Sequence, residues 1–212
     1  LEASKHLNIK DVIFASSSAV VGRTKNKISE DMGRLSPESY YGAIKMASEG
    51  LIASRKSYFL NDFVIFRFPN VVGPDSTHGV MFDFLNKLSN NPKEMEVLGD
   101  GEQKKPYLYI DDLIEGIFHI KSLPKRDKIY NLTPIDEGVK VKWIAKLFIN
   151  KLSPKTVPIY EKSAVGWQGD VPNYYYSYEK MLKTGWRPKF SAEEAIHKKL
   201  NEVLAAKNKQ KY

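Results

Sequence analysis

Tyr41 and Lys45 are the residues of this 212-residue chain whose types and spacing best suit acid-base chemistry. They lie four positions apart in the run from Tyr41 to Ile52, which is rich in helix-forming Ala, Met, Glu, Leu and Ile. In a helix this spacing places the phenol and the ammonium side by side on one face. A tyrosine with its ordinary pKa of about 10 is a poor base near neutral pH, but a neighbouring ammonium favours the phenolate. The pair is therefore suited to proton transfer at a sugar or alcohol hydroxyl.

An ordinary pair on a helix surface has the same spacing, so the segments around it decide between the two interpretations. Upstream, an apolar strand is predicted from Asp11 to Ala15, and Ser16, Ser17 and Ser18 follow it. Open α/β folds bind their ligands at the carboxyl edge of a parallel sheet, which is where these hydroxyls would lie. Serines at a strand end are also common turn formers.

Downstream, a second buried strand is predicted from Phe63 to Phe68. Pro69 marks its end because proline cannot donate a hydrogen bond to a neighbouring strand. Asn70 then presents an amide at the sheet edge, either as a ligand-binding group or as a turn residue before Gly73-Pro74. Each of the two strands thus ends in polar residues at the expected ligand-binding edge.

The strand with the triple serine, the YxxxK helix and the strand ending in RFPNVVGP follow one another in an order that resembles the extended short-chain dehydrogenase/reductase family. Within that family they resemble the NAD-dependent epimerases and dehydratases of the UDP-glucose 4-epimerase type. The resemblance extends over essentially the whole chain. It implies an α/β fold, in which a Rossmann-like parallel sheet, the C-terminal part of a nucleotide-binding domain, is joined to a smaller α/β substrate-binding domain.

No glycine-rich GxGxxG turn occurs anywhere in the sequence, and Leu1 is not a methionine. In a dinucleotide-binding sheet such a turn follows the first strand. The resemblance therefore implies that the chain begins within the nucleotide-binding domain and lacks its early strands. The expected divisions are a partial NAD-binding domain at residues 1–74 and a substrate-binding segment at residues 75–110. A helix and strand that return to the first domain follow at residues 111–135, and a C-terminal substrate-binding domain at residues 136–212.

The resemblance also implies roles for individual residues. The catalytic residues would be Ser17, Tyr41 and Lys45, with Ser18 as the alternative hydroxyl. The residues that bind NAD would be Ser16, Tyr41, Lys45, Phe68 and Pro69. The residues that bind the UDP-sugar would be Ser17, Ser18, Asn70, Val80, Leu98, Lys105 and Asp170. Val80 opens a predicted helix whose N-terminal amides suit a phosphate.

Two segments match the family with a departure in each. Residues 99–112 are similar to its GDGxQxRDFxYVDD pattern, but Lys105 replaces the arginine that grips a phosphate and loses the bidentate fork. Residues 164–172 resemble its RxGD loop, but Trp167 replaces the arginine. The nucleotide end of the substrate is therefore left open. By local pattern alone, the first segment predicts a hairpin around Gly99-Asp100-Gly101, followed by a helix capped by Asp111 or Asp112.

Composition excludes several classes of function. The chain has no cysteine, which rules out disulfides, thiolate zinc sites and cysteine nucleophiles and suits the cytoplasm. Its four histidines are scattered, so no metal site is expected. No apolar run approaches the roughly 20 residues of a membrane span. The net charge of +8 comes from lysines spread over every segment, which indicates a solvated surface rather than a nucleic-acid site.

Three functional hypotheses result. The first is a nucleotide-sugar epimerase, acting on UDP-glucose and UDP-galactose, that oxidises C4 transiently with bound NAD and returns the hydride to the opposite face. The second is a catalytic half that is inactive without a missing N-terminal portion. The third is an NAD(P)-dependent sugar-nucleotide dehydrogenase or reductase. Dehydration is disfavoured because Ser18-Ala19 replaces the Asp-Glu pair of the 4,6-dehydratases. The expected partner is that missing portion or a second copy, bound through Met46, Leu51 and Ile52.

Overall fold

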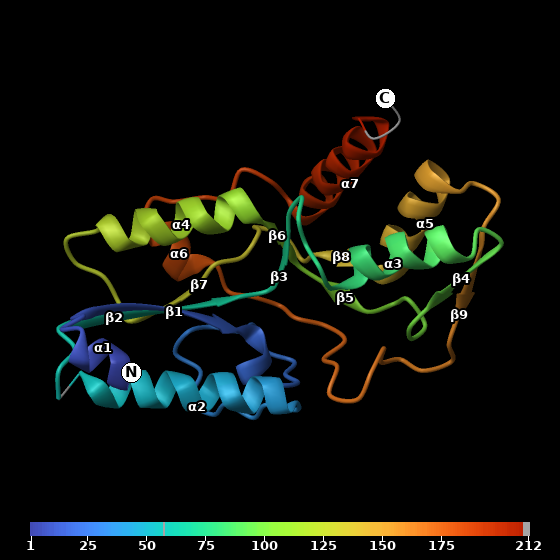
Figure 1. Ribbon diagram of the computed structural model, residues 1–212. Helices are drawn as coiled ribbons and strands as arrows, with labels where there is room; N and C mark the ends of the chain where they lie inside the picture. The colour runs from blue at the N-terminus through green and yellow to red at the C-terminus, as the bar shows by residue number, and fades with distance from the viewer. Residues whose placement is uncertain (57, 210–212) are drawn as a thin grey trace.

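The computed structural model describes residues 1–56 and 58–209. Figure 1 shows two parts side by side: a parallel sheet between helices, and a group of short two-stranded sheets with helices around them. The elements of the first part are α1 (Glu2–His6), β1 (Asp11–Ser17), the 3-10 helix η1 (Ser18–Val20), α2 (Tyr40–Arg55), β2 (Asp62–Phe68), α4 (Ile110–Ser122), β7 (Ile129–Asn131) and α6 (Glu179–Lys183).

The main sheet has the strand order β1-β2-β7, and all pairings in it are parallel. Helix α2 covers one face, and α4 and α6 cover the other (Figure 1). Phe63, Val64, Ile65 and Phe66 of the central strand are at most 6% exposed, as expected for a strand covered on both faces. In β1, at one edge of the strands described, Ile13 is 43% exposed. Strands β1 and β2 lie where the sequence predicts strands, and β7 adds a third parallel strand beside β2.

Helix α2 begins where the sequence predicts a catalytic helix. Ser39 is its N-cap, and the Ser39 hydroxyl accepts a hydrogen bond of 3.1 Å from the backbone N–H of Gly42. On its inner side Ile52 is buried with Leu60, Phe63 and Ile65. This burial removes Ile52 from the surface available to a second copy, so that part of the expected interface is wrong.

The second part is built around short strand pairs. Strands β3 (Asn70–Val72) and β6 (Tyr107–Tyr109) are parallel, as are β4 (Glu94–Val97) and β9 (Val157–Tyr160), whereas β5 (Lys104–Lys105) and β8 (Val139–Lys140) are antiparallel. Its helices are α3 (Val80–Asn90), α5 (Val141–Leu152) and α7 (Ala192–Lys209). Phe84 and Phe148 meet edge to face in its core, with ring centres 6.3 Å apart. None of the helices in the described ranges could cross a membrane.

Two local predictions are wrong. The Gly99-Asp100-Gly101 turn does not close a hairpin, because β4 pairs with β9 and β5 pairs with β8. Neither aspartate caps α4, whose N-cap is Tyr109. Asp112 instead accepts hydrogen bonds of 3.1 Å from the backbone N–H groups of Lys189 and Phe190. In both cases the observed partner comes from a segment distant in sequence, whereas the local pattern predicts a partner a few residues away.

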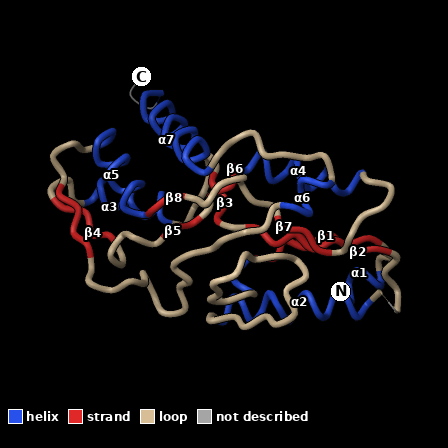
Figure 2. Tube along the Cα trace, turned by 180° about the vertical axis from the view of Figure 1, so that it is seen from behind, coloured by secondary structure: helices blue, strands red, loops and turns tan. Residues whose placement is uncertain are grey.

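Seen from behind, the long loops after η1 and after β9 approach the N-terminal end of α2 (Figure 2). A Cβ at Gly169 would lie 2.8 Å from the Glu38 carbonyl oxygen, so the second loop touches the start of the helix. Ile28 and Tyr176 form a bridge between the two loops. The second part of the molecule therefore adjoins the residues of the predicted catalytic site.

Candidate active site

The three serines after β1 have three different environments. Ser16 and Ser17 are adjacent in β1 and point to opposite faces, so Ser16 is 1% exposed while Ser17 is only partly buried. Ser18 begins η1 and is 5% exposed. The Ser17 hydroxyl accepts a hydrogen bond of 3.2 Å from the backbone N–H of Ala19. Ser17 pairs with Phe68 in the sheet register, so it lies at the joint carboxyl end of β1 and β2.

Close backbone packing places the N-terminal turn of α2 against this strand end. A Cβ at Gly42 would lie 2.3 Å from the carbonyl oxygen of Ala19, which leaves room for glycine alone. One turn further on, Lys45 Nζ donates a hydrogen bond of 2.7 Å to the carbonyl oxygen of Ala15 and lies 5.6 Å from the Tyr41 ring centre. Tyr41 itself is 55% exposed. The structure thus places Lys45 and the residue after Tyr41 against Ala15 and Ala19, on either side of Ser17.

A buried ionic group lies next to this site, and the sequence analysis did not single it out. Glu49 accepts hydrogen bonds from Ser16 Oγ at 2.5 Å, from Arg67 Nε at 2.9 Å and from Arg67 Nη2 at 2.6 Å. The signal for it was the spacing of Glu49, four residues after Lys45 on the same helix face. The Ser16 hydroxyl is thus occupied by its hydrogen bond to Glu49. A role for Ser16 in binding NAD stays a prediction.

The other polar neighbours of the site come from the second part of the molecule. Burial, opposed by the nearby hydroxyl of Ser18, raises the pKa of Tyr174 to about 12. Burial, opposed by a hydrogen bond with Asn70, raises the pKa of Tyr107. Asn70 itself is exposed at the start of β3. Its role, like those of Phe68 and Pro69 beside Ser17, stays a prediction.

Lys105 and Asp170, both predicted to bind substrate, form an ion pair with each other. They are 6% and 2% exposed, and the second carboxylate oxygen of Asp170 accepts a hydrogen bond of 3.1 Å from the backbone N–H of Gly166. The ring of Trp167, which is 58% exposed, covers the Lys105 ammonium with 4.4 Å between Nζ and the ring centre. The charge of Lys105 is therefore already neutralised within the protein.

The remaining predicted substrate residues border this ion pair or lie apart from it. Leu98 is 39% exposed, and a Cβ at Gly166 would lie 3.5 Å from the Leu98 Cβ, so Leu98 adjoins the loop that carries Trp167. Val80 is the first residue of α3, after Gly79 with its φ of 89°. Substrate binding by Leu98 and Val80 stays a prediction.

Comparison with known proteins identifies the family. Residues 1–133 match the model of the NAD dependent epimerase/dehydratase family. The chain belongs to this family. A crystal structure of UDP-galactose 4-epimerase superposes on it with a TM-score of 0.80 and 32% identity, covering 97% of this chain and 66% of that one. The family and the Rossmann-type α/β fold expected from the sequence are confirmed.

Curated relatives in the epimerase/dehydratase family differ in their stated activities. The uncharacterized UDP-glucose epimerase YtcB of Bacillus subtilis is 36% identical over 58% of this chain and 39% of its own length. The dTDP-4-dehydro-6-deoxyglucose reductase of Escherichia coli is 28% identical over 91% of this chain and 61% of its own length. The chain thus spans between about two fifths and three fifths of these relatives.

Proposed function

We propose that this protein is a nucleotide-sugar epimerase that interconverts UDP-glucose and UDP-galactose at C4 with NAD as cofactor. The observation that carries the proposal is that Tyr41 and Lys45 of α2 lie against the carboxyl end of β1, which carries Ser17 and adjoins the loops of the second part of the molecule. The similarity to UDP-galactose 4-epimerase, over 97% of this chain, supports the choice of reaction.

The residues beside β1 suit one end of NAD. Lys45 carries an ammonium whose donor capacity exceeds its single hydrogen bond to Ala15, so it can also bind ribose hydroxyls. Ala15 and Tyr41 are both exposed, and Phe68 and Pro69 follow at the end of the adjacent strand. No glycine-rich turn for the pyrophosphate occurs in the sequence. We therefore assign the nicotinamide and its ribose, and not the pyrophosphate, to these residues.

In the proposed mechanism the chain handles the proton at the C4 hydroxyl of the sugar. The Tyr41 phenolate removes this proton, and the adjacent Lys45 ammonium stabilises the phenolate. The partly buried Ser17 hydroxyl donates a hydrogen bond to the same sugar oxygen. NAD supplies hydride acceptance and return. The 4-keto sugar then turns over and presents its opposite face. Tyr41 gives the proton back to the C4 oxygen.

Net reduction or oxidation of a nucleotide-sugar is the second candidate. It is favoured by the Escherichia coli relative, whose name states a reductase. The same three residues would serve net hydride transfer, and the distinction lies in whether the reduced cofactor leaves the enzyme. Dehydration stays disfavoured, because Ala19 has no side-chain acid and Ser18 is buried. A third proposal, that these residues work only together with a further nucleotide-binding portion, is compatible with either reaction.

A coupled assay on the full-length protein tests the proposal. UDP-galactose is supplied with NAD, and UDP-glucose and free NADH are followed separately. We expect UDP-glucose to form without stoichiometric NADH. Stoichiometric NADH would establish a dehydrogenase instead, and no conversion of either UDP-sugar would refute the epimerase. Tyr41→Phe should abolish conversion, whereas Tyr40→Phe, at a neighbouring side chain that is 93% exposed, should not.

We also propose that α2 mediates a homodimer. Three apolar side chains on its outer surface, Tyr40, Ile44 and Leu51, are 93%, 66% and 55% exposed. Uncovered apolar groups of this kind favour association. Sedimentation velocity of wild type and Leu51→Glu should show a dimer that weakens in the variant. A wild-type monomer at micromolar concentration would exclude the dimer.

A further inference from the structure

We infer that Glu49 and Arg67 are positioning residues, which hold Tyr41 and Lys45 of α2 in register with Ser17 of β1. This inference rests on the proposed function. Tyr41, Lys45 and Glu49 lie four residues apart and share one helix face. Tyr41 and Lys45 are the proposed acid-base pair, whereas Glu49 is buried, with 6% of its surface exposed.

Successive turns of α2 bind successive residues of β1. Lys45 donates to the carbonyl oxygen of Ala15, and Glu49 accepts from the hydroxyl of Ser16. Ser17, the proposed catalytic hydroxyl, is the next residue. Glu49 therefore links the helix to the strand immediately beside the residues that must meet at the sugar. Movement of α2 along β1 would break this contact.

Arg67 extends the same link to the central strand. Its Nε and Nη2 bind the two carboxylate oxygens of Glu49 as a fork, which restricts orientation as well as distance. Arg67 is the sheet partner of Ser16, so the three side chains connect α2, β1 and β2 at one level. The pairing of Ser16 with Arg67 lies one residue before the pairing of Ser17 with Phe68.

Stability alone gives a poor account of this group. A buried ion pair is often no more stabilising than apolar residues of similar size. Within the described residues Arg67 Nη1 is buried without a hydrogen-bond partner, which adds a further cost. Directional contacts that hold one helix face against two strand ends explain the same arrangement, because catalysis depends strongly on placement.

The test separates placement from stability with a double variant. Glu49→Gln leaves Arg67 as a buried, uncompensated charge and should lower both the melting temperature and kcat. The double variant Glu49→Met/Arg67→Met removes both charges and should regain the melting temperature. Its kcat for UDP-galactose should stay about 10- to 100-fold below wild type, with KM within about twofold. Recovery of kcat together with the melting temperature would overturn the inference.

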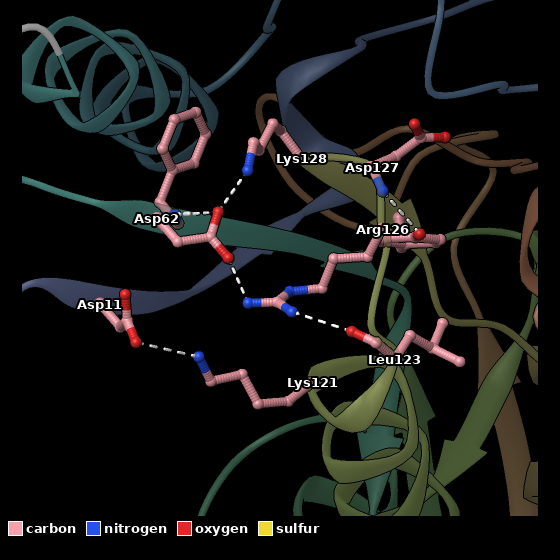
Figure 3. Close-up of polar contacts among 9 residues, drawn as sticks. Asp11, Asp62, Lys121, Leu123, Arg126, Asp127 and Lys128 are labelled. Atoms are coloured by element: carbon pink, nitrogen blue, oxygen red, sulfur yellow. Dashed lines mark hydrogen bonds and ion pairs between the residues drawn. The ribbon is translucent and has the colours of Figure 1, made fainter.

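A matched control lies at the opposite end of the same strand. Figure 3 shows Asp62 at the start of β2, bound by Arg126 and Lys128, whereas Ser17 pairs with Phe68 at the far end of that strand. The double variant Asp62→Asn/Arg126→Met should change stability but leave kcat within about twofold, because this end of the sheet carries no proposed catalytic group. A fall in kcat as large as that of the Glu49/Arg67 double variant would show that any buried pair has the same effect.

Hydrogen exchange gives a readout that does not need activity. In the Glu49→Met/Arg67→Met protein, amides of residues 40–52 should exchange faster than in wild type, even at equal melting temperature. Unchanged exchange there would overturn the inference. If wild type shows no epimerase activity, the proposed function fails, whereas the exchange experiment still decides whether Glu49 and Arg67 hold the helix.

Discussion

Ser16, Ser17 and Ser18 show how one side-chain type takes different tasks at adjacent positions. Ser16 donates to a buried carboxylate, Ser17 lies at the open strand end, and Ser18 is buried near Tyr174. Ser16 and Ser17 differ because neighbouring side chains of a strand point to opposite faces, whereas Ser18 belongs to η1 and is buried there. The choice of Ser17 over Ser18 therefore depends on where β1 ends and η1 begins.

Substitution of these serines should separate catalysis from stability. Ser17→Ala should lower kcat by about 100-fold, because a positioned hydroxyl is lost, and should cost about 1 kcal/mol of unfolding free energy, because this hydroxyl also caps η1. Ser18→Ala should leave kcat within about threefold and cost about 1 kcal/mol of unfolding free energy, from the loss of buried hydrogen bonding. Steady-state kinetics and urea unfolding measure the two effects. The reverse pattern would assign the catalytic hydroxyl to Ser18.

Lys105 offers a second prediction for a single residue. Lys105→Met should leave the Asp170 carboxylate buried without its cation and cost about 3–5 kcal/mol of unfolding free energy. Lys104→Met is the control. Lys104 pairs at 2.6 Å with Glu137, whose side chain is 73% exposed, and its loss should cost less than about 1 kcal/mol. Equal effects in thermal unfolding would contradict the assignment of Lys105 to a structural ion pair.

At the scale of elements, α2 determines the geometry of the site. Its N-terminal turn packs against η1 through Gly42, its middle binds β1 through Lys45, and its inner face binds β1 and β2 through Glu49. Three contacts along one helix fix its position along the strand and its rotation. Each depends on a residue type whose substitution has a specific structural consequence.

Two glycines of α2 provide a matched comparison. Gly42→Ala should place a methyl group 2.3 Å from the Ala19 carbonyl oxygen, force α2 away from η1 and destabilise the protein by about 2 kcal/mol. Gly50→Ala, where nothing lies within 4 Å, should stabilise it by up to about 1 kcal/mol through helix propensity. Urea unfolding of both variants checks this. Similar stability of the two would contradict the close packing at Gly42.

At the scale of the whole molecule, ion pairs at the amino end of the sheet link elements far apart in sequence. Asp62 at the start of β2 binds Arg126 and Lys128 in the segment before β7, and Lys121 of α4 lies 3.5 Å from Asp11 of β1 (Figure 3). Burial raises the pKa of Asp62, but the hydrogen bond and charge of Lys128 and the charge of Arg126 outweigh it and lower the pKa below 3.8.

This lowered pKa predicts a pH dependence of stability. A carboxyl group with a lower pKa in the folded state stabilises it above the ordinary value of 3.8, and the effect is lost as pH falls through the folded-state pKa. The unfolding free energy of wild type should exceed that of Asp62→Asn by about 1 kcal/mol near neutral pH, and this difference should vanish in stronger acid. Urea unfolding at several pH values measures it. A difference that does not depend on pH would exclude the ionic origin.

The sequence by itself determined the elements whose signals are local. The helix that carries Tyr41 and Lys45 and the buried strand from Phe63 to Phe68 were both predictable. Residue type, periodicity and turn-forming residues within a few positions specify such elements. The family motifs were equally visible, because their residues keep a fixed order and spacing along the chain.

Only the tertiary structure decided which distant residues meet. Strand β4 pairs with β9 and not within the expected hairpin. Lys105 forms an ion pair with Asp170, which lies 65 positions away in the sequence. Glu49 met Arg67 across 18 positions, on another element. These partners depend on the arrangement of whole elements and on the burial it creates, since an ionised group removed from water must find a counter-charge wherever the chain brings one. No local pattern carries that information.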